Sequence, residues 1–144
     1  KDNGCDHVIN YSKESFSEKI KEITNGIGVS VVYDGVGKKT FDQSIECLKV
    51  RGTMVSFGNA SGPLEPCNVT KSLAPKGLYL TRPSIAHYTS TREELDEAAN
   101  KVFKMFITKK IKLEIFKEYT LESIINAHQD LENRKILGPA IVIP

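Results

Sequence analysis

The fold is decided by the stretch Val29-Ser30-Val31-Val32-Tyr33-Asp34-Gly35-Val36-Gly37. Its β-branched residues favour a pleated strand, and its nearly continuous apolar character is typical of a parallel strand covered on both faces. An acidic residue and two glycines follow, and glycine lets another group approach the backbone closely. Because open α/β sheets bind ligands just past the carboxyl ends of their strands, residues 34–37 are a candidate ligand site. An ordinary strand-to-helix turn is the alternative interpretation.

Strands and helices alternate on both sides of this stretch. Before it, the pattern predicts a short strand over residues 8–11 and a helix that begins in a capping box formed by Ser15 and Glu18. After it, the pattern predicts a helix over residues 40–48, a break at Arg51-Gly52 and a strand over residues 53–57, followed by a loop rich in glycine and proline.

The second half continues the alternation. Residues 69–75 are ambiguous between a loop and a helical turn, and Thr91 is expected to cap a long helix that continues through Phe106. Thr120 is expected to cap a last helix that continues to Leu131. The remaining predicted strands cover residues 78–82, 111–116 and 140–143. This order of elements predicts a layered α/β fold with a parallel sheet.

Composition excludes several classes of function. The chain has 144 residues, of which 40% are hydrophobic and 26% charged, as is usual for one globular domain. A net charge of +2 gives no support for binding nucleic acid or a membrane surface, and no apolar run approaches the roughly 20 residues of a membrane span. The three cysteines lack C-x-x-C spacing, which argues for reduced thiols in the cytoplasm. The three histidines lack ligand spacing, so no metal site is expected.

A glycine-rich phosphate loop is missing from the sequence. A dinucleotide-binding fold normally opens with G-x-G-x-x-G, whose glycines let the pyrophosphate sit on a helix N-terminus. The glycine pairs Gly26/Gly28 and Gly35/Gly37 lack that spacing. A stand-alone nucleotide-binding module would need such a loop, so the residues alone predict an α/β module with ligand-facing strand ends and no phosphate loop.

Four motifs keep their order and spacing: Val8-Ile9-Asn10-Tyr11, residues 32–37, residues 51–62 and Leu80-Thr81-Arg82-Pro83-Ser84. Together they resemble the NADPH:quinone oxidoreductases, the zeta-crystallin-like and zinc-free branch of the medium-chain dehydrogenase/reductase superfamily. The resemblance covers essentially the whole chain and continues to the closing Ile141-Val142-Ile143-Pro144.

The resemblance implies a partial Rossmann fold, doubly wound and mainly parallel, without its first strand and glycine-rich loop. Residues 1–109 would be the C-terminal part of an NADP-binding domain. Residues 110–144 would be a return segment that packs on a GroES-like catalytic domain preceding Lys1, where the catalytic residues are expected. The full protein would then transfer hydride from NADPH to quinones, and this segment alone would be inactive, because hydride transfer needs donor and acceptor held together.

The resemblance also implies a set of cofactor contacts. Tyr11 would lie by the 2′-phosphate of NADPH, and Arg134 would reach back to the cofactor; alone, these would be an interfacial tyrosine and a solvated helix-end cation. Gly35 would lie near the adenosine half. The loop along the cofactor would be Phe57, Gly58, Asn59 and Ala60, and the stretch near the nicotinamide would be Pro83, Ser84 and Ile85.

Two expectations concern partners. An edge strand at Leu78–Arg82 would pair with its two-fold mate and form a homodimer. RNA binding or a bulk structural role, as in some zeta-crystallin relatives, is the alternative function, although no basic stripe with interleaved aromatic residues supports RNA binding.

Overall fold

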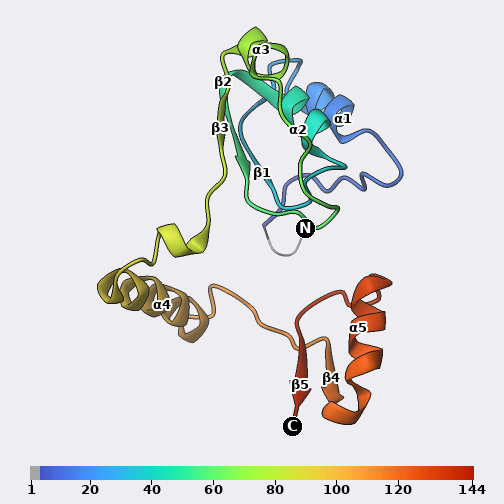
Figure 1. Ribbon diagram of the computed structural model, residues 1–144, viewed down its shortest axis with the longest axis vertical. Helices are drawn as coiled ribbons and strands as arrows, with labels where there is room; N and C mark the ends of the chain where they lie inside the picture. The colour runs from blue at the N-terminus through green and yellow to red at the C-terminus, as the bar shows by residue number, and fades with distance from the viewer. Residues whose placement is uncertain (1–3) are drawn as a thin grey trace. The chain divides into compact units, whose positions relative to one another are not determined.

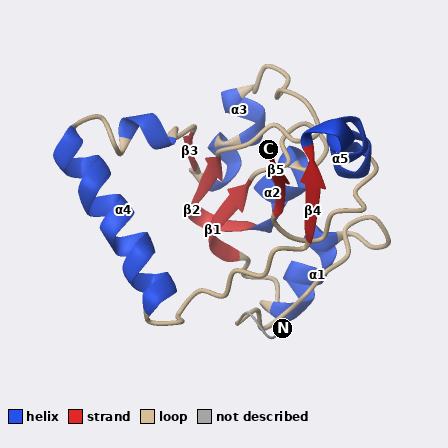
Figure 2. Ribbon diagram, turned by 90° about the horizontal axis from the view of Figure 1, so that it is seen from below, coloured by secondary structure: helices blue, strands red, loops and turns tan. Residues whose placement is uncertain are grey.

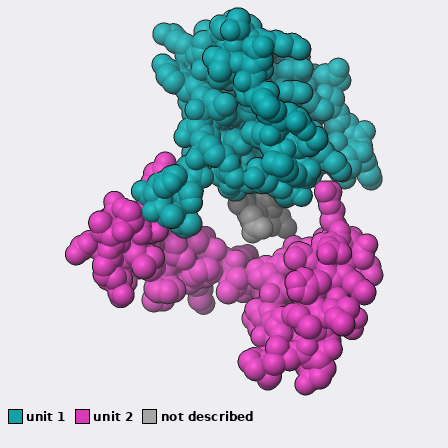
Figure 3. Space-filling view, in the orientation of Figure 1, with its two compact units in different colours: residues 1–87 teal, residues 88–144 magenta. Residues whose placement is uncertain are grey.

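The computed structural model describes residues 4–144. The chain forms two compact units, residues 1–87 and residues 88–144 (Figure 3). Each unit contains its own parallel sheet.

The first unit is built on a three-stranded parallel sheet. Its strands are β1 (Val29–Asp34), β2 (Leu48–Ser56) and β3 (Tyr79–Thr81), in the spatial order β1-β2-β3. Figure 1 shows the helices α1 (Phe16–Ile23) and α2 (Phe41–Cys47) together on one side of this sheet. The connection from β2 to β3 contains the single turn α3 (Val69–Ser72) and a 3₁₀ turn at Ala74–Lys76.

The core of this unit lies between the sheet and α2. Its buried apolar side chains are Phe41, Leu48, Met54 and Leu78, and Val32 and Ile45 pack against them. Side chains alternate across a strand, so the residues on either side of Val32 face away from this core. Val31 is accordingly 40% exposed and Tyr33 is 74% exposed.

Capping residues explain where the helices begin. The Ser15 hydroxyl accepts a hydrogen bond from the Glu18 N–H at 3.4 Å, and Thr91 forms a complete capping box with Glu94. Both predicted caps are therefore confirmed. Thr40 precedes α2 as its N-terminal cap residue, but its hydroxyl bonds Asp34 instead of the helix backbone.

The predicted strand over residues 8–11 is wrong. The structure has irregular backbone at residues 8–10 and a turn that begins at Tyr11. A strand needs a partner for its backbone groups, and β1, at the edge of the sheet, pairs only with β2 among the described residues.

The predicted break at Arg51-Gly52 is also wrong, because both residues lie inside β2. The register shifts there: Val29 pairs with Leu48, whereas Val31 pairs with Thr53. Arg51 has a left-handed φ of 60°. Arg51-Gly52, which the sequence pattern indicated as a break, thus forms a bulge inside β2 and does not end the strand.

The second unit contains a long helix and a βαβ motif. The helix α4 covers Arg92–Ile107. The strands β4 (Lys117–Thr120) and β5 (Ala140–Ile143) are parallel neighbours, as Figure 2 shows, and α5 (Ile124–Glu132) connects them. The strand predicted over residues 111–116 is wrong: these residues are irregular and β4 begins at Lys117. Thr120 caps a 3₁₀ turn at Leu121–Ser123 that leads into α5.

Among residues 4–144, no helix combines the length and the apolar character that crossing a membrane requires.

Candidate functional site

Asp34 holds the end of β1 against the start of α2. Its carboxylate is 4% exposed and accepts four hydrogen bonds. Oδ1 accepts from the N–H groups of Val36 and Gly37 at 2.8 and 2.9 Å. Oδ2 accepts from the hydroxyls of Thr40 and Ser44, both at 2.8 Å.

These bonds also set the ionisation of Asp34. Burial favours the neutral acid, but the bonds from Gly37, Thr40, Ser44 and Val36 together outweigh burial and lower the pKa of Asp34. The Asp34 carboxylate is therefore charged at neutral pH, and both of its oxygens accept hydrogen bonds from the protein itself. The sequence analysis predicted that Asp34 would accept a hydrogen bond from a ligand. In the structure, its carboxylate instead stabilises the turn between β1 and α2.

The loops that follow β1 and β2 are joined by backbone hydrogen bonds. The Phe57 N–H donates to the Asp34 carbonyl at 2.9 Å, and the Ala60 N–H donates to the Gly35 carbonyl at 3.3 Å. Ser61 donates twice to the Val36 carbonyl, from its N–H at 2.7 Å and from its hydroxyl at 2.8 Å. The two strand ends therefore form one continuous hydrogen-bonded edge.

Two glycines allow this close approach. A Cβ on Gly58 would lie 2.2 Å from the Gly35 carbonyl oxygen, and a Cβ on Gly35 would lie 3.0 Å from the Phe57 ring. The group that approaches Gly35 is thus the neighbouring loop. Any larger residue at position 58 would push the two loops apart.

A cleft opens beside this edge, at the carboxyl ends of β2 and β3. We call it the strand-end cleft; its volume is about 600 Å³, and it is lined by Phe57, Arg82, Pro83, Ser84, Ile85 and His87. Arg82 Nη1 donates to the Ser56 carbonyl at 2.9 Å, which ties the end of β3 to the end of β2. The His87 N–H donates to the Ser84 carbonyl at 3.0 Å and closes the 3₁₀ turn Ile85–His87.

The structure brings together most of the residues that the resemblance singled out. Phe57, Pro83, Ser84 and Ile85 line the strand-end cleft. Gly35, Gly58, Asn59 and Ala60 belong to the two joined loops.

Tyr11 and Arg134 are not among the residues that line the cleft. The Tyr11 ring packs edge-on against Phe16 with centroids 6.5 Å apart. Arg134 belongs to the second unit, where it has a left-handed φ of 55° and its N–H donates to the Leu131 carbonyl at 3.1 Å. The assignment of these two residues to the cofactor stays a prediction.

Sequence reasoning missed Arg82 and His87. Arg82 was predicted as the end of an edge strand and as part of a family motif, without a role in ligand binding, and His87 as one of three scattered histidines. A usable signal was present, because both residues flank Pro83-Ser84-Ile85, the stretch that the resemblance placed by the nicotinamide.

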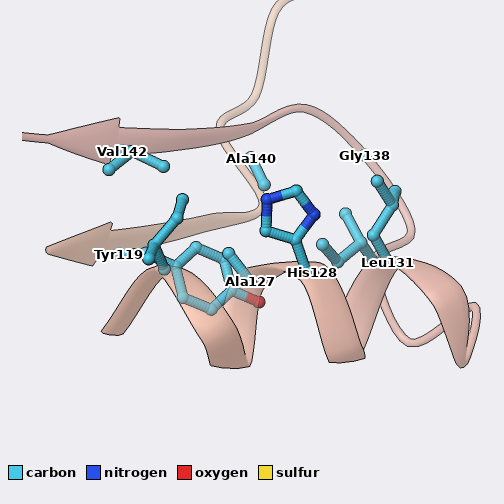
Figure 4. Close-up of a pocket in the computed structure, with 9 residues that line it drawn as sticks. Tyr119, Ala127, His128, Leu131, Gly138, Ala140 and Val142 are labelled. Carbon is cyan, nitrogen blue, oxygen red and sulfur yellow. The ribbon is translucent and has the colours of Figure 1, made fainter. Parts of the chain in front are cut away.

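A second pocket lies between α5 and the β4–β5 sheet. Its volume is about 260 Å³, and apolar side chains from α5 and both strands dominate its lining. Figure 4 shows the His128 imidazole extending from α5 toward the strands. The exposed Lys117 and Lys135 and the Tyr119 hydroxyl surround Asp130 on this helix, and hydrogen bonds from Lys117 and Tyr119 lower the pKa of Asp130 to about 2.

The residues present do not form a zinc site. Within the described range 4–144, no group of three His, Cys, Asp or Glu side chains could hold a metal ion.

Comparison with known proteins places this geometry in a family. The family model for zinc-binding dehydrogenases matches residues 1–104. A quinone oxidoreductase from Salmonella typhimurium is 46% identical over 99% of this chain and 44% of its own length. Quinone oxidoreductase 1 of Escherichia coli is 43% identical over 98% of this chain and 44% of its own length. A 2-haloacrylate reductase from Burkholderia is 38% identical over 98% of this chain and 43% of its own length.

Solved structures agree. A mycobacterial protein solved in complex with NADPH is 41% identical, with a TM-score of 0.91 over 99% of this chain and 45% of its own. The Escherichia coli quinone oxidoreductase complexed with NADPH is 44% identical, with a TM-score of 0.90 over 96% of this chain and 43% of its own. The fold thus matches the C-terminal Rossmann-like part of quinone oxidoreductases, and the chain spans less than half the length of these relatives. With the family model matching most of its residues, the chain belongs to the zinc-binding dehydrogenase family.

Proposed function

We propose that this chain is the C-terminal part of a quinone reductase that uses NADPH. The observation that carries the proposal is the strand-end cleft, which collects apolar and hydrogen-bonding groups past the carboxyl ends of two parallel strands. Ligands of open α/β sheets bind in this position. Relatives with 46% and 43% identity are named as quinone oxidoreductases, and two similar structures are NADPH complexes.

Bound NADPH supplies a hydride for the acceptor. On this proposal the joined loops, with Gly35 and residues 57–60, support the cofactor along its length, and Pro83, Ser84 and Ile85 hold its nicotinamide end. We assign Tyr11 and Arg134 to the cofactor as well, Tyr11 at the 2′-phosphate, where a phenolic O–H is a suitable donor.

The proposed cofactor contacts also give each part of the chain a proposed role. We propose that residues 1–109 complete the cofactor domain and that residues 110–144 pack on a catalytic domain outside this chain. Hydride transfer needs both reactants held in line, so this chain alone is expected to be inactive. A homodimer through the β3 edge and a cytoplasmic location complete the proposal; the three unpaired cysteines are consistent with a reducing compartment.

The test compares the full-length enzyme with this chain alone. NADPH oxidation with a quinone such as phenanthrenequinone is expected only for the full-length enzyme, and NADH is expected to be the poorer donor. Lack of turnover by the full-length enzyme with a panel of quinones would refute the assignment, and turnover by this chain alone would refute the division of labour.

A single substitution probes the cofactor. Tyr11→Phe removes the phenolic O–H and keeps the ring that packs on Phe16. The KM for NADPH is expected to rise about tenfold, the effect of one lost hydrogen bond to a charged group, and the KM for NADH is expected to stay the same. Tyr33→Phe, at an exposed tyrosine on β1, is the matched control. Equal changes for both cofactors would contradict the assignment of Tyr11.

A further inference from the structure

The lining of the strand-end cleft carries positive charge and no negative charge. Its six lining residues include the cation Arg82 and the hydrogen-bond donor His87, and none of them is acidic. Phe57, Pro83 and Ile85 supply apolar surface to the same lining. Such a lining matches a flat apolar ligand that carries a negative charge at one end.

Arg82 is held in place for such a ligand. One of its five N–H donors is used by the Ser56 carbonyl at 2.9 Å. That bond holds the guanidinium at the end of β2, and it leaves the other donors of the group available at the cleft that Arg82 lines. A guanidinium fixed in this way can bond both oxygens of a carboxylate or sulfonate in parallel.

The phosphates of the cofactor are a poorer match for this cation. A Rossmann-type fold holds the pyrophosphate on its glycine-rich loop, which this sequence lacks, whereas Arg82 follows β3 at an edge of the three-stranded sheet. Pro83, Ser84 and Ile85, the stretch proposed for the nicotinamide, line the same cleft as Arg82. We therefore place Arg82 at the nicotinamide end, where the acceptor meets the cofactor.

We propose that the strand-end cleft selects electron acceptors that carry an anionic group on a planar ring, with Arg82 and His87 as the specificity-determining residues. The inference rests on the proposed reductase function and names its substrate class. The acceptor quinone gains a hydride from NADPH and a proton from water and leaves as the hydroquinone, and NADP⁺ is the other product. The anionic group is unchanged by the reaction and serves only for recognition.

The test uses the full-length enzyme and two acceptors that share one ring system. Anthraquinone-2-sulfonate is the anionic acceptor and 2-(hydroxymethyl)anthraquinone is the neutral one. The measured quantity is the ratio of their kcat/KM values, in which effects common to both acceptors cancel. The wild type is expected to favour the sulfonate, and added salt is expected to weaken that preference.

Substitutions assign the preference to the two residues. Arg82→Gln is expected to lower the ratio about tenfold, the effect of one lost hydrogen bond to a charged group. Arg82→Lys keeps the charge and is expected to restore part of the preference, and His87→Phe is expected to lower the ratio severalfold. Arg92→Gln is the matched control, because Arg92 is an exposed cation of α4 outside the cleft lining.

Two results would overturn the inference while the reductase function stands. One is turnover of both acceptors with the same ratio in wild type, Arg82→Gln and His87→Phe. The other is a raised KM for NADPH in Arg82→Gln with an unchanged ratio, which would assign Arg82 to the cofactor. If neither acceptor is reduced, the proposed function fails, and equilibrium dialysis of anthraquinone-2-sulfonate decides the inference: binding that weakens in Arg82→Gln supports it, and absence of binding overturns it.

Discussion

The Asp34 carboxylate joins the end of β1 to the start of α2 through four hydrogen bonds. Replacing it in Asp34→Asn keeps the shape but removes the charge and turns one acceptor into a donor that faces the Thr40 or Ser44 hydroxyl. We expect a loss of about 2–3 kcal/mol in the free energy of unfolding, as hydrogen bonds to a buried charged group are replaced. Urea unfolding at neutral pH measures the loss.

The pH dependence of stability gives an independent check on Asp34. Because folding lowers the pKa of Asp34, its stabilising contribution is fully present above the ordinary unfolded value of about 3.9 and disappears as the pH falls through the folded value. The difference between wild type and Asp34→Asn should therefore shrink in acid. Asp42→Asn, at an exposed acid on α2, is the control and should change stability little. Equal losses in the two variants would contradict this account of Asp34.

At the end of β1, the sequence indicated an acceptor and two glycines but not the groups that they contact. The pattern placed an acceptor and two glycines at a strand end, and all three are there. It could not show that the loop after β2 would use the space beside Gly35, because that contact joins residues more than twenty positions apart. Arg82 was missed for the same reason, since its partner is the Ser56 carbonyl on the neighbouring strand.

Among the elements, β2 carries strain that can be measured. Arg51 has a φ of 60° at the bulge, and a left-handed conformation costs a residue with a Cβ about 1–2 kcal/mol. Arg51→Gly should therefore raise the free energy of unfolding by about 0.5–1 kcal/mol, after the extra chain entropy that glycine loses on folding. Arg51→Ala removes the same side chain and keeps the strain, so a gain of equal size in Arg51→Ala would assign the effect to the side chain.

The βαβ motif of the second unit is held together by Asp130. Its pKa is about 2 because Lys117 and Tyr119 on β4 donate to its carboxylate. Lys117→Met should raise the pKa of Asp130 toward its ordinary value, measured by carboxyl ¹³C NMR. Stabilisation of this motif by the charged carboxylate is present above about 3.8 and lost as the pH falls through about 2. Lys112→Met is the control, and a similar shift in that variant would argue against a specific pair.

The same motif shows that an alternating sequence pattern does not locate a strand by itself. Alternation over residues 111–116 indicated a strand, yet the pairing register selects Lys117–Thr120, because Lys117 is opposite Ala140 and Thr120 is opposite Ile143. A strand forms only where its backbone groups find a partner strand. The partner of β4 is β5, which follows α5 in the chain. Helices α1, α2 and α4 were predicted more closely, since their caps and apolar spacing are local.

For the whole molecule, the alternation of elements was enough to predict a parallel α/β fold. What it could not indicate is which apolar side chains stay exposed. Val8 is 66% exposed, Ile107 is 81% exposed and Leu137 is 84% exposed. Alternating patterns predict which face of an element is apolar, but they do not predict which other segment covers that face.

The edge of β3 is the surface proposed for pairing with a second copy. Among residues 4–144, β3 pairs with β2 alone, and Tyr79 on this strand is 63% exposed. An unpaired edge recruits another strand, and a lysine on such an edge discourages pairing. In the full-length protein, Tyr79→Lys should weaken the proposed homodimer at least tenfold, measured by sedimentation velocity across a dilution series. Tyr88→Lys, at a tyrosine 68% exposed outside the strand, should leave the dimer intact. A wild type that sediments as a monomer at every concentration would rule out the β3 dimer, and equal weakening by both lysines would place the interface elsewhere.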